Sequence, residues 1–430
     1  MKWSRYNIIY QKDEKTFILY NYANDSVIFL LKELKEIVEL YKENIDHLFT
    51  VHPDLYKELE RKRFILDNKI NEADSVIDKI NKKLDSSDSL KLTINPTLDC
   101  NLKCWYCYET HIPNNQINTD TFEAIKKLIL MNLSSEKFNK IELSFFGGEP
   151  LFKTKKNVLS IISFVKELCD RKEMTLNLQF TTNALLLNTK LIKELTSFSP
   201  SISIQVPFDG GRDKHNKVKK TSNARGSYDI ILKNVINAFS HGIRVNVRCN
   251  YTTENILSFK DLIKDIDEYA SEYKNLISIA MQQIWQDSSD FDLYKKVMDI
   301  KTDLISKHFY NNLTGLGAVS LPCYADYTHS FVINYNGDIF KCTARDFNSK
   351  NRIGVLQCDG SIFYEKKHDK WLESRYNSEC RNCIILPICT ICSQKKYENP
   401  NVNSCPIIIS DKDKRNQIIY RLESLIYNYL

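Results

Sequence analysis

Residues 90 to about 310 alternate between strand-like and helix-like segments, and this alternation limits the fold more than any other feature. The predicted strands are 91–95, 140–146, 175–181, 201–206, 244–250 and 277–283. The predicted helices are 119–132, 154–171, 189–197, 227–241, 258–271 and 292–309. Six successive strand–helix units imply a parallel sheet, with functional residues at the carboxyl ends of its strands.

Three cysteines follow the first predicted strand in the order C-x3-C-x2-C, at Cys100, Cys104 and Cys107. Structural zinc takes four closed ligands, whereas three thiolates on a four-iron cluster leave one iron open for chemistry. The alternative is three free cysteines in a core, and the loop-like flanks Asp99 and Asn101 weigh against it. The spacing therefore favours a [4Fe–4S] cluster.

Glycines and polar residues stand at the ends of the following strands. Gly147 and Gly148 let backbone approach a neighbour closely, and Glu149 beside them can pair with an ammonium group. The third, fourth and fifth strands contribute further polar residues, namely Thr182, Asn183, Asp209 and Arg248. We expect all of them at one edge of the sheet.

The cysteine loop and the Gly-Gly-Glu-Pro strand end together resemble the radical S-adenosylmethionine (SAM) enzymes, whose core is a partial (β/α)6 barrel. The resemblance implies that Cys100, Cys104 and Cys107 hold the SAM-cleaving cluster, and that Glu149 takes the amino group of SAM. The SAM contacts that it implies are Tyr106, Gly147, Gly148, Glu149, Thr182, Asn183, Asp209 and Arg248. The chain departs from the family pattern at Ala184 (for glycine), Pro207 (for serine), Asn216 (for aspartate) and Lys219 (for arginine).

Seven cysteines near the C-terminus follow a second pattern, C-x13-G-x4-C, then C-x2-C-x5-C-x2-C, then a last cysteine. It resembles the SPASM extension of radical SAM enzymes, which holds auxiliary [4Fe–4S] clusters, although the central run there ends in C-x3-C. The resemblance implies an outer cluster on Cys380, Cys383, Cys389 and Cys405, and an inner cluster on Cys323, Cys342 and Cys392. Three clusters are then expected in all.

Two alternatives concern these auxiliary sites. The C-x2-C pairs are typical of zinc knuckles, but five residues between Cys383 and Cys389 are fewer than a zinc ribbon uses. Relatives with a fully ligated inner cluster have a cysteine shortly before Cys323, and residues 314–321 contain none. We therefore expect an open iron in the inner cluster, unless Cys358 closes it.

Residues 1–88 form a first domain by pattern, before a barrel at 89–312 and a cysteine-rich domain at 313–430. Predicted strands at 6–10, 16–20 and 26–30 precede predicted helices at 31–42, 53–66 and 72–83. The pattern resembles the winged-helix module that recognises leader peptides in peptide-modifying enzymes; the alternative is a structural cap. The expected fold class is α/β, with a winged-helix-like α+β module before the barrel.

Composition narrows the function classes. A net charge of +6 without a basic stripe does not favour nucleic acid, and the lysine-rich run Lys217 to Lys220 is expected on a solvated face. No signal-peptide pattern and no run of about 18 apolar residues is found, so we expect a cytoplasmic chain that does not enter a membrane. Thirteen cysteines in that compartment favour metal or redox chemistry over disulfides.

The resemblance implies a maturase of a ribosomally made precursor peptide, which uses a 5′-deoxyadenosyl radical to form a thioether or carbon–carbon crosslink. Its partners would be the peptide with its leader and an electron donor such as flavodoxin or ferredoxin. One alternative is an anaerobic sulfatase maturase that makes formylglycine, but Thr343 stands where that branch has an aspartate base, and Asp346 lies nearby. Another is a non-catalytic scaffold that binds zinc and a peptide.

Overall fold

The computed structural model describes residues 1–85, 88–134, 138–221, 225–288, 291–307, 309, 323–401 and 403–429, so the cysteine-free stretch 314–321 lies outside the described residues. The chain divides into two compact units, each of which is described by itself. Unit 1 comprises Met1–Ser86, Thr314–Tyr327 and Lys370–Leu430. Unit 2 comprises Ser87–Leu313 and Thr328–Asp369. Residues 328–369, which lie in the C-terminal region by sequence, therefore belong to the unit that contains the predicted barrel.

Unit 2 is built on a ten-stranded sheet in the order β11-β10-β9-β8-β7-β6-β12-β13-β14-β15. Six neighbouring strands are parallel: β6 (Ser89–Asn95), β7 (Lys140–Phe145), β8 (Thr175–Thr181), β9 (Ser201–Phe208), β10 (Arg244–Tyr251) and β11 (Ile277–Gln283). β12 (Ser330–Asn334) extends the parallel run beside β6, and β13 (Asp338–Phe340), β14 (Gly354–Leu356) and β15 (Ile362–Tyr364) follow antiparallel. The predicted α/β fold with six parallel strands is confirmed.

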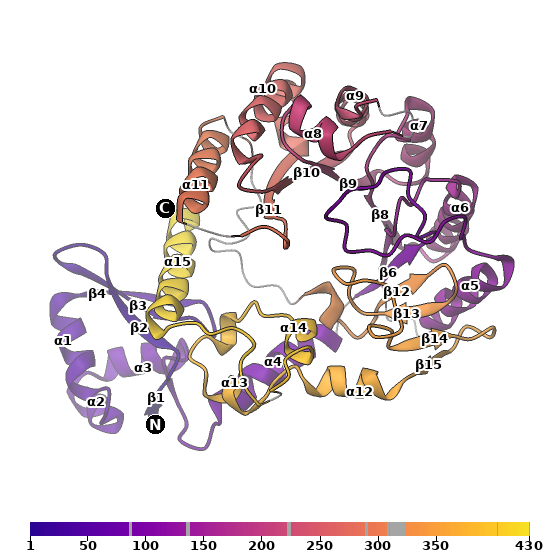
Figure 1. The fold of residues 1–430 in the computed structure, drawn as a ribbon. Helices are drawn as coiled ribbons and strands as arrows, with labels where there is room; N and C mark the ends of the chain where they lie inside the picture. The colour runs from indigo at the N-terminus through magenta and orange to yellow at the C-terminus, as the bar shows by residue number, and fades with distance from the viewer. Residues whose placement is uncertain are drawn as a thin grey trace. The chain divides into compact units, whose positions relative to one another are not determined.

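The helices of unit 2 run along the outer side of the curved sheet (Figure 1). They are α5 (Thr119–Leu133), α6 (Lys155–Arg171), α7 (Thr189–Phe198), α9 (Tyr228–Ser240), α10 (Phe259–Ala270) and α11 (Phe291–Ser306), each within three residues of its predicted bounds. Asn118 and Asn188 begin α5 and α7 by accepting backbone N–H bonds. The short helix α8 (Arg212–Val218) was not predicted as an element.

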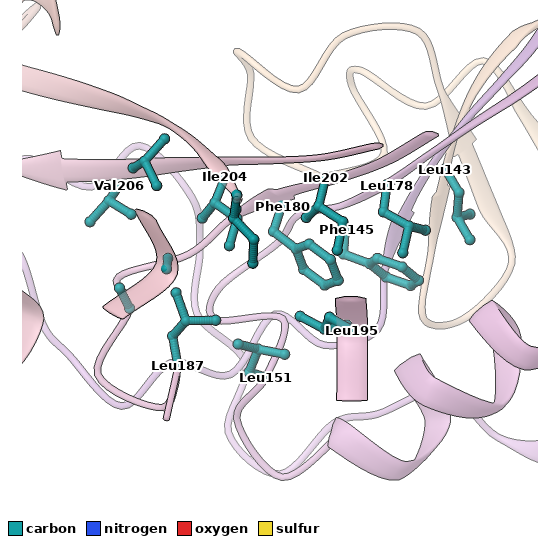
Figure 2. Packing of buried hydrophobic residues seen from close by; sticks show 14 of the residues in the cluster. Leu143, Phe145, Leu151, Leu178, Phe180, Leu187, Leu195, Ile202, Ile204 and Val206 are labelled. Atoms are coloured by element: carbon teal, nitrogen blue, oxygen red, sulfur yellow. The ribbon is translucent and has the colours of Figure 1, made fainter. Parts of the chain in front are cut away.

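The two faces of the sheet differ in chemistry, because successive side chains of a strand point to opposite sides. On β9, Ile202, Ile204 and Val206 are buried, and Figure 2 shows them with the apolar residues of β7 and β8. The rings of Phe145 and Phe180 stack there at 5.1 Å. The other face is polar: for example, the Asn246 amide donates to Gln205 Oε1 at 3.2 Å. The apolar face binds the helices, and the polar face is left for a site.

Unit 1 begins with an antiparallel sheet of β2 (Asn7–Gln11), β3 (Thr16–Asn21) and β4 (Ser26–Leu31), and with a pair of short strands, β1 (Lys2–Trp3) and β5 (Ile65–Leu66). Its helices in this region are α1 (Lys32–Tyr41), α2 (Ile45–Val51), α3 (Pro53–Arg61) and α4 (Glu72–Asp85). The prediction of one helix over 53–66 was wrong in length. Arg63 takes a left-handed φ of 62°, which ends the helix and turns the chain into β5.

The core of unit 1 joins both ends of the sequence. The C-terminal part contributes α13 (Ser378–Asn382), α14 (Ser393–Tyr397) and α15 (Asp411–Tyr429). Ile418 and Leu422 of α15 pack in one cluster with Ile18 and Tyr20 of β3. The Arg421 guanidinium donates to Asp25 Oδ2 at 2.7 Å and to the Tyr20 hydroxyl at 3.1 Å. Residues 370–429 are therefore part of the same folded body as the N-terminal strands.

A search of the described residues finds no helix that is both long and apolar enough to cross a membrane.

Replacing Phe145 with alanine is expected to lower the free energy of unfolding of unit 2 by about 3 to 5 kcal/mol, because a buried stacked ring leaves a cavity. Urea unfolding followed by circular dichroism measures the change. Ile230→Ala, at a half-exposed position of α9, is the control and should cost less than about 1 kcal/mol. Equal losses in both variants would contradict the proposed core.

Candidate active site

One cavity of unit 2 gathers the carboxyl ends of the parallel strands. Its walls come from the loop after β6, from the turns after β7 and β8, and from the ends of β9, β10 and β11. The predicted site residues that line it are Cys100, Cys104, Tyr106, Cys107, Gly147, Gly148, Thr182, Asn183 and Arg248. Glu149 and Asp209 do not line it: both are fully buried behind its wall.

The segment that leads into the cysteine loop is held by Asp99. Its carboxylate accepts the backbone N–H of Cys100 at 3.0 Å and that of Asn114 at 2.9 Å, and Lys153 Nζ lies 3.2 Å away. Within the loop, the Cys107 N–H donates to the Cys104 carbonyl at 3.1 Å. These bonds close a compact loop that presents all three cysteines to one cavity.

Gly147 and Gly148 bring the turn after β7 against this same segment. A Cβ at Gly147 would lie 2.3 Å from the Thr97 carbonyl oxygen, and one at Gly148 would lie 2.4 Å from the Asp99 carbonyl oxygen. Gly147 also has a left-handed φ of 102°. The close approach that requires these glycines is thus between two backbone segments of the chain.

Glu149 joins the turn after β7 to the turn after β8. Its carboxylate accepts the Thr182 hydroxyl at 2.7 Å, the Asn183 N–H at 2.8 Å and the Leu151 N–H at 3.1 Å. Burial raises the pKa of Glu149 to about 7, although the three hydrogen bonds act to lower it. The predicted contact of Glu149 with SAM stays a prediction.

The turn after β8 also reaches the cysteine loop. The Asn183 amide donates to Asn101 Oδ1 at 2.7 Å. Ala184, which stands where the family pattern has glycine, takes a left-handed φ of 61°. The backbone conformation suited to glycine is therefore kept despite the alanine.

A network of buried polar side chains forms another part of the cavity wall. Lys219 and Asp209 form an ion pair, and the Tyr106 hydroxyl donates to Asp209 Oδ1 at 2.5 Å. Asn250 Nδ2 donates to the same hydroxyl, and Arg248 Nε donates to Asn250 Oδ1, both at 3.0 Å. The expectation that the lysine-rich run Lys217 to Lys220 lies on a solvated face was wrong for Lys219, because α8 ends at Val218 and the chain turns this ammonium inward to the Asp209 carboxylate.

Aromatic residues that the sequence analysis did not select form another part of the wall. Trp285 follows β11, stacks on Tyr108 at 5.4 Å, and has the Arg345 guanidinium 5.3 Å from its ring centre. The Gln286 amide donates to the Tyr106 carbonyl at 3.0 Å. The position of Trp285, two residues after the carboxyl end of β11, was the signal that could have identified it.

Two further missed residues follow Cys107. His111 Nε2 lies 3.5 Å from Cys107 Sγ. Glu109 lines the cavity, and its Oε2 is buried with no hydrogen-bond partner among the residues that the structure describes. Burial and, secondly, the Asp346 carboxylate raise the pKa of Glu109 to about 8. Glu109 and His111 therefore place two titratable side chains in this part of the cavity wall, beside the cysteine thiols.

The donor set of the loop fits an iron–sulfur cluster better than a single ion. Among the described residues, no three Cys, His, Asp or Glu side chains are grouped closely enough to hold one metal ion. A tetrahedral zinc ion draws its sulfurs within about 2.3 Å of one centre, whereas each thiolate of a cubane binds a different iron. Burial raises the pKa of Cys107 to about 11, and a metal would remove that proton on ligation.

The C-terminal cysteines belong to both units. In unit 1, the Cys383 N–H donates to the Cys380 carbonyl at 3.1 Å. Burial raises the pKa of the Cys389 thiol, and the Cys380 and Cys383 thiols raise it further. The Cys405 N–H donates to Glu379, the neighbour of Cys380, at 2.8 Å. All four cysteines predicted to bind the outer cluster therefore lie in one region of unit 1.

The predicted inner ligands remain a prediction. Cys323 and Cys392 line a second cavity, inside unit 1, with Arg375 and Tyr376. Cys342 follows β13 in unit 2, where the Ala344 N–H donates to its sulfur at 3.3 Å. Cys358, the alternative ligand, is exposed in the turn between β14 and β15.

Comparison with known proteins finds one family and several relatives that resemble this chain. Residues 94–270 match the Radical SAM superfamily. A cysteine-type anaerobic sulfatase-maturating enzyme of Clostridium novyi is 24% identical over 351 residues, covering 73% of this chain and 90% of that protein. An uncharacterized protein of Methanocaldococcus jannaschii is 25% identical over 307 residues, covering 65% and 96%.

Two solved structures share the fold. Native anSMEcpe with bound AdoMet and a Kp18Cys peptide has a TM-score of 0.58 at 16% identity, covering 79% of this chain and 98% of that one. Streptococcus suis SuiB bound to the precursor peptide SuiA has a TM-score of 0.51 at 17% identity, covering 94% and 98%. At these identities the likeness concerns the arrangement of the strands and helices.

Replacing Glu149 with glutamine is expected to change how stability depends on pH. The pKa of Glu149 is about 7 in the folded chain and 4.5 in the unfolded chain. The free energy of unfolding of the wild-type chain therefore falls as the pH rises from 4.5 to 7. The loss is at most about 3 kcal/mol, and a neutral amide does not show it.

Urea unfolding of the metal-free chain at several pH values measures this difference. The stability of Glu149→Gln relative to wild type should rise across that interval. A constant or falling difference would contradict the burial of an ionisable carboxyl at this position. Glu123→Gln, at an exposed residue of α5, is the control and should show no such trend.

Proposed function

We propose that this chain, whose residues 94–270 match the Radical SAM superfamily, is a maturase that oxidatively crosslinks a ribosomally made precursor peptide. The observation that carries the proposal is the single cavity in which three cysteines meet the ends of six parallel strands. The crosslink is a thioether or a carbon–carbon bond. Electrons reach the chain from a small donor such as flavodoxin or ferredoxin in the cytoplasm, where thiols stay reduced.

Cys100, Cys104 and Cys107 hold a four-iron cluster, and SAM occupies the cavity beside them. A four-iron cluster bound there would supply the reductive cleavage of SAM to methionine and a 5′-deoxyadenosyl radical. That radical would take a hydrogen atom from the peptide. Gly147, Gly148, Thr182, Asn183 and Arg248 line the cavity and make direct contacts with SAM. Glu149 is proposed to take the amino group of SAM, and Asp209 to contact SAM as well. Both carboxylates are buried, and they accept hydrogen bonds from Thr182, Asn183 and Tyr106.

The chain's own residues must also orient the peptide and keep water away from a reactive carbon. Phe146, Tyr108 and Trp285 give the cavity an apolar wall, and Arg248 and Asn250 give it a polar one. Such a mixture suits a peptide whose reacting side chain is held by apolar contacts while polar groups hold SAM.

The C-terminal cysteines bind two auxiliary clusters in this proposal. Cys380, Cys383, Cys389 and Cys405 hold the outer one, and Cys323, Cys342 and Cys392 hold the inner one, with an open iron unless Cys358 closes it. Clusters held there would supply an acceptor for the electron that the substrate gives up, which would make the net reaction an oxidation. The hydrogen bonds that join Cys383 to Cys380, and Cys405 to Glu379 beside Cys380, support the outer set.

A peptide substrate is supported by the two solved structures, which hold a Kp18Cys peptide and the precursor SuiA. The resemblance to SuiB extends over 94% of this chain. We propose that the N-terminal sheet of β2, β3 and β4 receives the leader as an added strand on an exposed edge.

Formylglycine formation is the second candidate, favoured by the relative that is named a sulfatase-maturating enzyme. The aspartate base of that branch is replaced by Thr343, and Asp346 is already engaged. Asp346 Oδ1 accepts the Thr110 N–H and Oδ2 accepts the Thr110 hydroxyl, both at 2.8 Å. These contacts indicate that Asp346 holds the segment after Cys107 in place rather than acting as a base for the substrate.

Loading the chain with iron and sulfide without oxygen tests the proposal. Wild-type protein should bind about twelve irons and convert SAM to 5′-deoxyadenosine on reduction. Cys104→Ala should lose about four irons and all 5′-deoxyadenosine, because it lacks one ligand of the first cluster. Cys169→Ala, a buried cysteine of α6 outside the cavity, is the control and should keep both.

Zinc without iron in the wild-type chain would contradict the proposal and leave a metal-binding scaffold. The two reactions are then separated on the modified peptide. A crosslink removes two hydrogens and leaves no aldehyde, whereas formylglycine reacts with a hydrazide probe. Hydrazide labelling of the product would favour the second candidate.

A further inference from the structure

The Tyr106 hydroxyl uses all of its hydrogen-bonding capacity inside the wall of the cavity. It donates to Asp209 Oδ1 at 2.5 Å, and it accepts from Lys219 Nζ and from Asn250 Nδ2, both at 3.0 Å. A hydroxyl has one proton to donate and two lone pairs to accept with, so no capacity remains. The ring of Tyr106 is therefore fixed in position and orientation.

Lys219 is the charged member of this network, and its side chain is 2% exposed. Its backbone is fixed on both sides: its N–H donates to the His215 carbonyl at 2.8 Å, and its carbonyl accepts the Ser227 hydroxyl at 2.7 Å. A buried ammonium is tolerated only when it is paired, and Asp209 supplies the opposite charge. The ammonium is thereby directed at Asp209 and Tyr106.

Asp209 is fixed as firmly as Lys219. Asn255 Nδ2 donates to its carbonyl oxygen at 3.1 Å, and its backbone N–H donates to His215 Nδ1 at 3.4 Å. The three partners of Tyr106 come from the end of β9, from the residue after α8 and from β10. A single side chain of the cysteine loop is thus tied to three separate elements of the barrel.

Tyr106 is also held at its backbone, because the Gln286 amide donates to its carbonyl oxygen at 3.0 Å. It stands between Cys104 and Cys107, which are themselves joined by an N–H···O bond of 3.1 Å. Fixing both ends of Tyr106 therefore fixes the spacing of these two thiols against the barrel.

We propose that Lys219 is a positioning residue, which acts through Asp209 and Tyr106 to hold the loop of Cys104 and Cys107 in register with the barrel. This inference rests on the proposed function for the role of the loop as a cluster ligand. It differs from a direct contact between Lys219 and the carboxylate of SAM. An ammonium is compact and reaches two oxygens on different residues, whereas a planar guanidinium needs a fork-shaped partner. Lysine therefore suits this network better than arginine.

Two variants test the inference in the metal-free chain. Tyr106→Phe removes the hydroxyl and leaves the Lys219–Asp209 pair intact. The double variant Lys219→Met with Asp209→Leu removes both charges together, so no unpaired ion stays buried. Should the double variant fail to fold, Tyr106→Phe still tests the step on which the inference depends, that the Tyr106 hydroxyl holds the loop, and unchanged exchange in that variant would overturn it. Lys220→Met changes the exposed neighbouring lysine and serves as the control.

Hydrogen–deuterium exchange of the segment 104–108 is the first measurement, because amide exchange reports local opening. Both variants should exchange about tenfold faster than wild type, the order expected when one strong hydrogen bond is lost. Combining all three substitutions should add no further acceleration, because each acts through the same hydroxyl. Unchanged exchange in both variants would overturn the inference.

The electron paramagnetic resonance signal of the reduced, iron-loaded chain without SAM is the second measurement. Both variants should change its line shape in the same way, while Lys220→Met leaves it unchanged. A signal unchanged in both variants, together with SAM affinity lost only in the double variant, would assign Lys219 to direct SAM binding and overturn the inference. A wild-type chain that takes up no iron would contradict the proposed function instead, and the exchange data would still test the positioning of the loop.

Discussion

The site depends on one close contact between two backbone segments. The turn at Gly147 and Gly148 lies against the carbonyl oxygens of residues 97–99, with no space for a side chain between them. This contact sets the cysteine loop at the end of β7, although the loop itself follows β6. Parallel pairing of β6 and β7 brings the two strand ends together, and the glycines allow the turns beyond them to touch.

Buried charge then fixes the walls of the cavity. The Glu149 carboxylate ties the turn after β7 to the turn after β8. The Lys219–Asp209 pair ties Tyr106 of the cysteine loop to the end of β9 and to the residue after α8. Each of these groups is satisfied by several partners, as burial of a polar group requires. The residues that face the cavity can therefore be few, because a second layer of buried polar groups holds them in place.

The division into two units gives the C-terminal region two structural roles. Residues 328–369 extend the barrel sheet, with β12 parallel to β6. Residues 370–429 complete the core of the N-terminal strands, where Arg421 meets Asp25. Because the N-terminal sheet and the cysteine-rich segment share one core, a change in one alters the stability of the other.

The sequence by itself determined the parallel strands, their helices, the cysteine loop and the polar residues at the strand ends. These features rest on local periodicity and on spacing within a few residues, which are read directly from the chain. Nine of the eleven residues predicted for the SAM-cleaving site line one cavity for that reason, since the carboxyl ends of parallel strands meet at one edge.

Only the tertiary structure decided which side chains face that cavity. Glu149 and Asp209 lie behind the wall, Lys219 is buried despite its place in a lysine-rich run, and Glu109 enters from a position without a recognisable motif. It likewise joined residues 370–429 to the N-terminal sheet. Such contacts connect residues that are tens to hundreds of positions apart, and they depend on how whole elements pack, which no local pattern encodes.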